Sequence, residues 1–130
     1  MIKKTCATFF LALNLLFASS LVYSAQVWDL YNFKVQPGKA PAVLKAFNDL
    51  QTSEAGSNRI ASVHLQQSVF GGSSGTTHSI VALYPSRAEF ERARMALAGT
   101  KAWRKFQAAM GANSEAINNS AMETLMGWGT

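Results

Sequence analysis

The feature that most constrains the fold is a change of hydrophobic period at Pro37-Gly38. Before it, residues 27–36 (VWDLYNFKVQ) alternate between two faces, and period two with aromatic and β-branched residues is typical of a strand. One face carries Val27, Asp29, Tyr31, Phe33 and Val35, and the other carries Trp28, Leu30, Asn32, Lys34 and Gln36. After it, an amphipathic helix is predicted from Ala40, with Pro41 tolerated in its first turn. Its apolar stripe is Val43, Leu44, Phe47 and Leu50.

The rest of the chain supplies a hairpin, a second helical region and a final strand. Residues 59–70 and 76–84 alternate on either side of a Gly/Ser loop at 71–75, which predicts a β-hairpin. Ser86 with Glu89 three residues later is a capping-box signature for a helix. Gly99-Thr100 is expected to break or bend that helix. Its inward stripe is Phe90, Ala93 and Leu97, followed by Ala102, Trp103, Phe106 and Met110. Residues 111–120 are polar, and 121–128 (AMETLMGW) are interpreted as the last strand.

The resulting order is strand, helix, strand, strand, helix, strand. Such a split β-α-β arrangement predicts an α+β, ferredoxin-like domain. It has a four-stranded antiparallel sheet with both helices on one face, and it occupies residues 25–130.

Residues 1–24 are interpreted as a secretory signal peptide. Lys3 and Lys4 precede an apolar stretch that ends in small residues. Cleavage is expected after Ser24. Cleavage after Ala25 is the second choice, because it would place the bulky Tyr23 at a position that favours small side chains. The alternative is an uncleaved membrane anchor. It is disfavoured because the stretch is short and contains Asn14. The expected location is the bacterial periplasm or the exterior, with no stable membrane span after cleavage.

Composition excludes several classes of function. The only cysteine is Cys6, inside the signal, so the mature domain has no disulfide, cysteine nucleophile or Cys-ligated metal. The formal charge of +5 falls to +3 when Lys3 and Lys4 are removed. So small an excess, with acids interspersed, does not indicate nucleic-acid binding.

The register of the hairpin predicts which face of the sheet is open. If the loop centres near Ser73, His78 pairs with Ser68 and His64 with Ala82, so even positions share a face. The odd positions are more hydrophobic and are expected to face the helices. They include Val63, Leu65, Val81 and Leu83. The even face would then carry His64, Gln66, Ser68, Phe70, His78, Ile80 and Tyr84, together with Trp28, Leu30, Asn32 and Lys34. So large an exposed apolar patch indicates an interface or a ligand site, and a second copy of the chain could cover it.

The element order, the VQPGK corner and the helix ending AWRKFQ resemble the dimeric α/β-barrel superfamily, in particular its antibiotic-biosynthesis-monooxygenase-like and NIPSNAP-like members. The resemblance is topological and covers essentially all of the mature chain. It implies a homodimer with a cavity between helices and sheet or between two sheets. Its members include cofactor-free oxygenases, haem-degrading enzymes, isomerases and proteins without known activity. No family site motif is present, so no catalytic residue is carried over.

His64 and His78 are the only histidines and the candidate proton-transfer groups, because their pKa lies near neutrality. On the register above they share a face but stand about 13 Å apart at strand rise, too far to bind one metal within a subunit. A metal site that bridges two subunits is the disfavoured alternative, and no metal or cofactor is expected. The preferred interpretation of each histidine is a hydrogen-bonded cavity wall.

Three functions fit these observations. The first is an exported homodimer that binds a small apolar or aromatic ligand through Trp28, Asn32, His64, Gln66, His78 and Tyr84. The second is a cofactor-independent monooxygenase-like enzyme with His64 or His78 as base. The third is a dimerisation module in which a second copy of the chain covers the even face and leaves no cavity. The sequence does not decide whether a reaction is catalysed.

Overall fold

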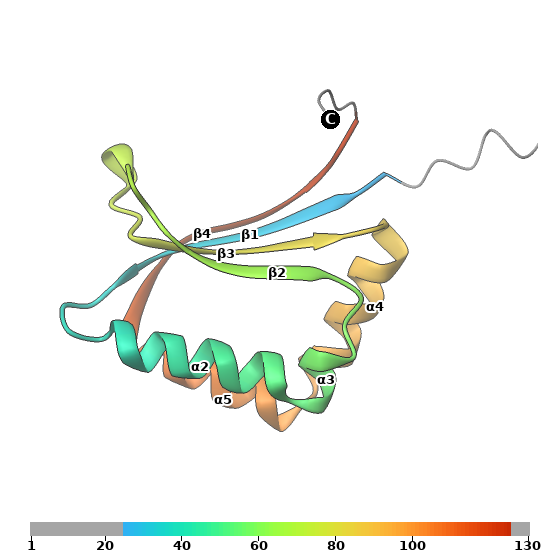
Figure 1. Ribbon diagram of the computed structural model, residues 1–130, viewed down its shortest axis with the longest axis horizontal. Coiled ribbons are helices and arrows are strands. Elements are labelled where there is room, and N and C mark those ends of the chain that lie inside the picture. Colours follow the sequence, from blue (N-terminus) through green and yellow to red (C-terminus); the bar gives the residue numbers. More distant parts are fainter. Residues whose placement is uncertain (1–24, 126–130) are drawn as a thin grey trace, which may run out of the picture.

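Strands and helices form two layers in a computed structural model that describes residues 25–125 (Figure 1). The sheet contains β1 (Val27–Val35), β2 (Ser62–Gln67), β3 (His78–Tyr84) and β4 (Ser114–Glu123). The helices are α2 (Ala40–Thr52), α3 (Glu54–Ser57), α4 (Arg87–Ala98) and α5 (Lys101–Asn113), with a 3₁₀ turn, η1, at Gly72–Ser74. The signal-peptide interpretation falls on residues outside this described range. Within the range, no helix is long and apolar enough to span a membrane.

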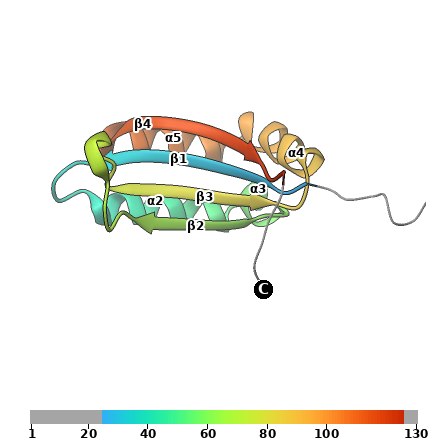
Figure 2. The same ribbon diagram turned by 90° about the horizontal axis from the view of Figure 1, so that it is seen from above.

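The sheet has the order β2-β3-β1-β4, and all its neighbours are antiparallel. All the helices lie on one side of it. Seen from above, the four strands lie in front of α2 and α5, so no helix within residues 25–125 covers their near face (Figure 2). The predicted ferredoxin-like α+β fold is therefore confirmed. We call the side toward the helices the inner face of the sheet and the opposite side the outer face.

Local sequence signals place the helix ends. Gly38, with φ of +75°, makes the corner between β1 and α2. Ser86 accepts a hydrogen bond from the Glu89 amide at 3.2 Å, as the capping box predicts, and begins α4. Thr100 caps the start of α5, because its side-chain oxygen accepts a hydrogen bond from the Trp103 amide at 3.2 Å. The expected break at Gly99-Thr100 is thus the boundary between two helices.

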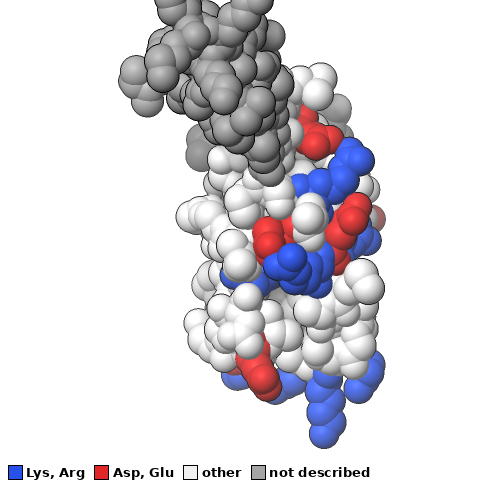
Figure 3. All heavy atoms as spheres, turned by 90° about the vertical axis from the view of Figure 1, so that its right-hand side faces the viewer, with Lys and Arg blue, Asp and Glu red and all other residues white. Residues whose placement is uncertain are grey.

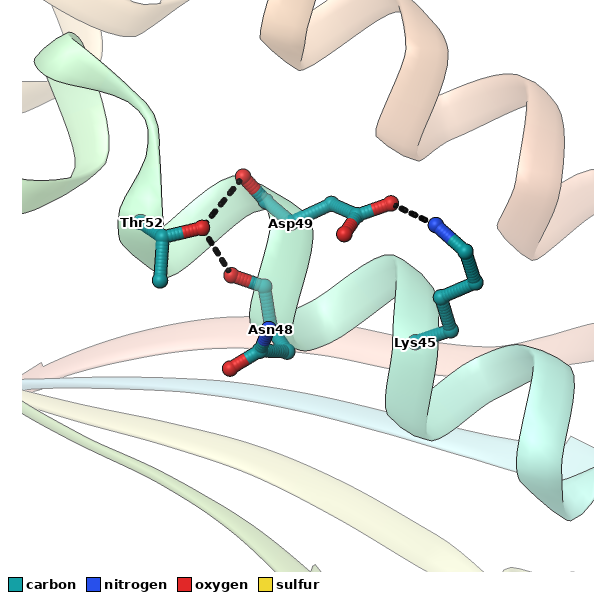
Figure 4. A network of polar contacts seen from close by, with 4 residues as sticks. All are labelled: Lys45, Asn48, Asp49 and Thr52. Atoms are coloured by element: carbon teal, nitrogen blue, oxygen red, sulfur yellow. Dashed lines mark hydrogen bonds and ion pairs between the residues drawn. The ribbon is translucent and has the colours of Figure 1, made fainter.

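The exposed side of α2 is held by local polar contacts (Figure 4). Lys45 Nζ lies 2.6 Å from Asp49 Oδ2, four residues later. Thr52 Oγ1 donates to the Asn48 carbonyl oxygen at 2.9 Å. Burial is confined to the other side of this helix, where Val43, Ala46 and Leu50 face the sheet. Leu44, expected in the apolar stripe, is instead 58% exposed.

The hydrophobic core has two parts. The first contains Phe33, Val43, Ala46, Leu50, Leu97, Phe106 and Met110, and joins the middle of the sheet to α2 and α5. The second contains Val27, Ala82, Tyr84 and Ala93, beneath α4. The helix layer therefore contacts the sheet in two places.

The predicted register of the hairpin was wrong by one residue. His78 pairs with Gln67, not Ser68, and His64 pairs with Val81, not Ala82. The loop contains a 3₁₀ turn and two glycines with positive φ, Gly72 and Gly75, so its centre falls between Gly72 and Ser73. A slip of one residue exchanges the two faces of a strand.

The correction applies to β3 alone. Val63 and Leu65 of β2 do face the helices, and Trp28, Asn32, His64 and Gln66 do lie on the outer face. On β3, however, His78, Ile80, Ala82 and Tyr84 lie on the inner face, whereas Ser79, Val81 and Leu83 lie on the outer face. Phe70 belongs to neither face, because it lies in the loop and is 91% exposed.

The last strand begins earlier than predicted. β4 starts at Ser114, so most of the polar segment 111–120 is strand, and of the predicted 121–128 only residues 121–123 belong to it. The remainder is partly outside the described range. Ile117 forms a bulge, since Asn32 pairs with Asn118 but Phe33 pairs with Ala116. Pairing with β1 on a sheet edge needs few apolar side chains, which explains why periodicity missed this strand.

Candidate functional site

A cavity of about 390 Å³ lies between the inner face and the helices. It borders both parts of the core, touching Leu50, Phe106 and Met110 of the first and Ala82 of the second. Its volume falls at the lower end of the range for small-molecule sites, roughly 300–1,000 Å³. The lining residues come from both layers: Asp29, Tyr31, Leu50, Gln51, Arg59, Ile80, Ala82, Trp103, Phe106, Gln107, Met110, Gly111, Ser114, Ala116 and Asn119.

Aromatic rings supply much of the apolar wall. Trp103 and Phe106 stack with ring centroids 5.4 Å apart on α5. Tyr31 stacks on Phe33 at 5.1 Å on the facing strand. The interpretation of Trp103 and Phe106 as helix core is thus correct only in part, because both also line the cavity. Two aromatic walls on opposite layers are suited to a flat, apolar ligand.

Asp29 is the only carboxylate among the residues that line the cavity. Burial raises the pKa of its carboxyl group, and the positive charges of Arg94 and Arg59 offset this only in part. No ion pair within 4.0 Å joins Asp29 to either arginine in the described part of the chain. A partly buried carboxyl group of raised pKa in a cleft is a recognised mark of a functional site.

The lining has further polar groups on Gln51, Arg59, Tyr31 and Ser114. Gln51, at the end of α2, accepts a hydrogen bond from Arg59 Nη2 at 2.5 Å. Burial raises the pKa of the Tyr31 phenol, and its hydrogen bond with Ser114 acts in the opposite direction. Asp29, Gln51 and Arg59 therefore form a polar side of the cavity, whereas the rings of Tyr31, Trp103 and Phe106 supply its apolar wall.

The six residues predicted to bind ligand do not form one site. Tyr84 is 2% exposed beneath α4, and its ring meets Phe90 edge to face at 5.4 Å. His78 lies on the inner face, stacked on Phe33 at 5.9 Å, with Nδ1 2.9 Å from Thr77 Oγ1. Neither lines the cavity. The expectation that His78 and Tyr84 lie on the side of the sheet opposite the helices was therefore wrong.

The other four of the six do share the outer face. His64 is exposed, with Nε2 2.7 Å from Ser62 Oγ. Asn32 links neighbouring strands, because it accepts from Ser79 Oγ at 2.5 Å and donates to Asn118 Oδ1 at 2.7 Å. The two histidines lie on opposite faces, so the premise that they share one was wrong. No group of three or more metal-ligating side chains occurs among the described residues.

The resemblance implied a cavity between helices and sheet or between two sheets, but the residue patterns did not identify its lining, although one signal for it was present. Asp29 interrupts an otherwise apolar face of β1, between Val27 and Tyr31, and a lone acid in such a position calls for an explanation. Arg59 and Gln107 gave no comparable signal, because their proximity to Asp29 depends on how the layers pack.

No family model matches the chain, and no curated protein matches it. Solved structures do. A candidate antibiotic biosynthesis monooxygenase from Caulobacter crescentus is 22% identical, with a TM-score of 0.61, over 85% of this chain and 99% of that one. The cofactor-independent oxygenase SnoaB from Streptomyces nogalater is 12% identical, with a TM-score of 0.59, over 80% and 97%.

Two more solved structures, both of proteins of unknown function, are similar to the chain. A NIPSNAP family protein of unknown function from Agrobacterium tumefaciens is 18% identical, with a TM-score of 0.56, over 79% of this chain and 90% of that one. A dimeric ferredoxin-like protein of unknown function from Thermobifida fusca is 10% identical, with a TM-score of 0.52, over 79% and 92%. The predicted resemblance is confirmed at the level of fold: this chain has the ferredoxin-like fold of antibiotic-biosynthesis-monooxygenase-like and NIPSNAP-family proteins.

Proposed function

We propose that the protein binds a small, flat and partly apolar molecule in the cavity between the inner face and α5. The observation that carries this proposal is the pairing of an aromatic wall with an isolated carboxyl group, Asp29, at the opposite side of the same cavity. Apolar walls supply affinity, and a few placed polar groups fix the orientation of the ligand.

Gly111 offers a direct test. It lines the cavity on α5, and a Cβ added there would meet no atom within 4 Å. Gly111→Leu should therefore leave the fold intact while its side chain occupies ligand space. We expect naphthalene-sized probes to raise the melting temperature of the wild type and to have no effect on Gly111→Leu.

Ala108→Leu is the matched control, because Ala108 is exposed on the same helix and does not line the cavity. It should respond to the probes like the wild type. If Gly111→Leu responds equally well, the ligand binds elsewhere and the proposal is wrong.

A second candidate function is cofactor-independent oxygenation, which the position of Asp29 favours. A base works best when its pKa lies close to the working pH, and burial moves the pKa of Asp29 upward from its ordinary value of 3.8. In this candidate Asp29 accepts the proton of a phenolic hydroxyl group, and dioxygen oxidises the resulting anion. SnoaB, a cofactor-independent oxygenase, has the same fold.

Oxygen uptake with a quinol substrate tests this candidate. Asp29→Asn should lower turnover at least a hundredfold, in line with the usual contribution of a general base. His64→Ala and His78→Ala serve as controls outside the cavity and also test the base predicted from the sequence. Loss of turnover in either histidine variant, with Asp29→Asn unaffected, would reverse the assignment.

We propose in addition that the protein forms a homodimer through the outer face. Trp28 and Met122 are 40% and 53% exposed there, beside Leu30 and Leu83. Apolar exposure of this kind is typical of an interface. The Thermobifida fusca protein with this fold is dimeric.

Export is the remaining proposal, and the pattern of residues 1–24 supports it. Fractionation of the host followed by N-terminal sequencing should find the protein outside the cytoplasm, beginning at Ala25 or Gln26. A full-length chain in the membrane fraction would favour an anchor instead.

A further inference from the structure

Arg59 is held at the wall of the cavity by its neighbours. It follows α3 and precedes β2, and its Nη2 donates to Gln51 Oε1 at 2.5 Å. Ser53 caps α3 by accepting from the Gly56 amide at 3.1 Å, and Gly56 is buried against the end of α2. A Cβ on Gly56 would approach Leu50 O to 1.9 Å. The guanidinium group therefore has a defined position before any ligand arrives.

One donor of this group has no acceptor. Arg59 Nε is buried and makes no hydrogen bond to any described residue. A buried donor without a partner is unfavourable, and more so when the group is charged. Native structures rarely keep such groups without a reason, and a catalytic role or a bound ion is among the recognised reasons.

The charge of Arg59 is also poorly compensated. Asp29 is the only acid that lines the cavity, and it makes no ion pair within 4.0 Å with Arg59 or Arg94 among the described residues. Arg94 contributes a second positive charge to the same region, where it lowers the pKa of Asp29. Tyr84 is the other titratable neighbour of Arg59: burial raises the pKa of its phenol, and the charge of Arg59 and a hydrogen bond with it act in the opposite direction. Arg59 belongs to the lining of the cavity, whereas Arg94 lies outside it, with its Cζ 5.3 Å from the centroid of the Phe90 ring.

The other arginines of α4 differ in this respect. Arg87 Nη2 lies 2.7 Å from Glu123 Oε2, and Arg92 pairs with Glu89. Acidic and basic side chains accordingly lie next to one another on the end of the molecule that carries α4 (Figure 3). Arg59, which lines the cavity, makes no such ion pair among the described residues.

We infer that the ligand carries an anionic oxygen, of a carboxylate or a phenolate, which Arg59 receives at the polar side of the cavity while the ring system packs against Trp103 and Phe106. This inference rests on the proposed function and narrows it from flat, apolar molecules to aromatic anions. Arg59 is suited to such a group because a guanidinium donates several parallel hydrogen bonds to carboxylate oxygens.

A pair of probes with the same ring tests the inference. 2-Naphthoate is anionic at pH 7, and 2-naphthalenemethanol is neutral. Calorimetry on the wild type should give at least tenfold tighter binding of naphthoate, because a hydrogen bond to a charged group contributes about 1.5–3 kcal/mol. Arg59→Gln should remove this preference and leave the affinity for the alcohol within about threefold. Arg87→Gln, the matched control at the α4 end, should keep the preference.

The outcomes separate this inference from the proposed function. Equal binding of both probes to the wild type overturns the anion specificity and leaves the cavity as a ligand site. Binding of neither probe removes both proposals. A preference that persists in Arg59→Gln assigns the anion to another residue and overturns the role of Arg59. If Arg59→Gln fails to fold, Arg59→Lys keeps the charge without the planar fork and should reduce the preference without abolishing it.

Discussion

At the scale of single residues, Asp29 combines an unfavourable environment with a central position. Its carboxyl group lies on the inner face, where burial raises its pKa more than Arg94 and Arg59 lower it. A group whose pKa is higher in the folded state than in the unfolded state binds more protons when folded. Stability therefore falls as the pH rises from the unfolded pKa through the folded pKa, and above that range the charged carboxylate destabilises the fold.

Asp29→Asn should consequently raise the free energy of unfolding at pH 7. The gain should shrink as the pH falls and vanish below the ordinary value of 3.8, where the wild-type carboxyl is protonated as well. Urea denaturation at several pH values measures this. Asp49→Asn is the control and should change the free energy of unfolding in the opposite direction, because the hydrogen bond from Lys45 lowers the pKa of Asp49. A loss of stability in Asp29→Asn at pH 7 would mean that the arginines dominate.

At the scale of elements, the helices were predictable because their signals are local. Ser86 and Glu89 mark the start of α4, and Thr100 marks the start of α5, each through a bond to an amide three residues away. The hairpin strands were predictable for the same reason. Their register was not, since it depends on the conformation of the loop between them.

Ser86→Ala removes the side-chain acceptor at the start of α4, and loss of such a cap costs about 0.5–2 kcal/mol. Chemical denaturation should show this loss with an unchanged dependence on denaturant. Ser73→Ala, in the exposed hairpin loop, should change stability by less than about 0.5 kcal/mol. Equal effects of the two variants would show that the cap contributes nothing.

At the scale of the whole molecule, the two layers define two surfaces with different roles. The inner face closes on the helices and leaves the cavity, whereas the outer face stays open (Figures 1 and 2). On the outer face, Leu30 lies opposite Val81 on β3 and Ser120 on β4. A charge introduced at this position would be buried if a second copy covered the sheet.

Leu30→Asp should therefore turn the proposed dimer into a monomer, since an unpaired buried charge is strongly unfavourable. Light scattering during gel filtration measures the mass. Met95→Asp is the matched control, because Met95 is 81% exposed on α4 and lies on the helix side. A wild-type mass of one chain, or dissociation by Met95→Asp alone, would exclude the outer face as the dimer surface.

The sequence by itself determined the order of the strands and main helices, the starts of α2 and α4 and the two faces of β1 and β2. Each of these depends on residues within a few positions of one another. Only the tertiary structure decided the register of β3, the strand at 114–120 and the cavity. The loop set the register, pairing with β1 made a strand of a polar segment, and layer packing brought Asp29, Arg59 and Trp103 around one space. Contacts between residues far apart in the chain produce no hydrophobic periodicity in the sequence, so the sequence pattern does not predict them.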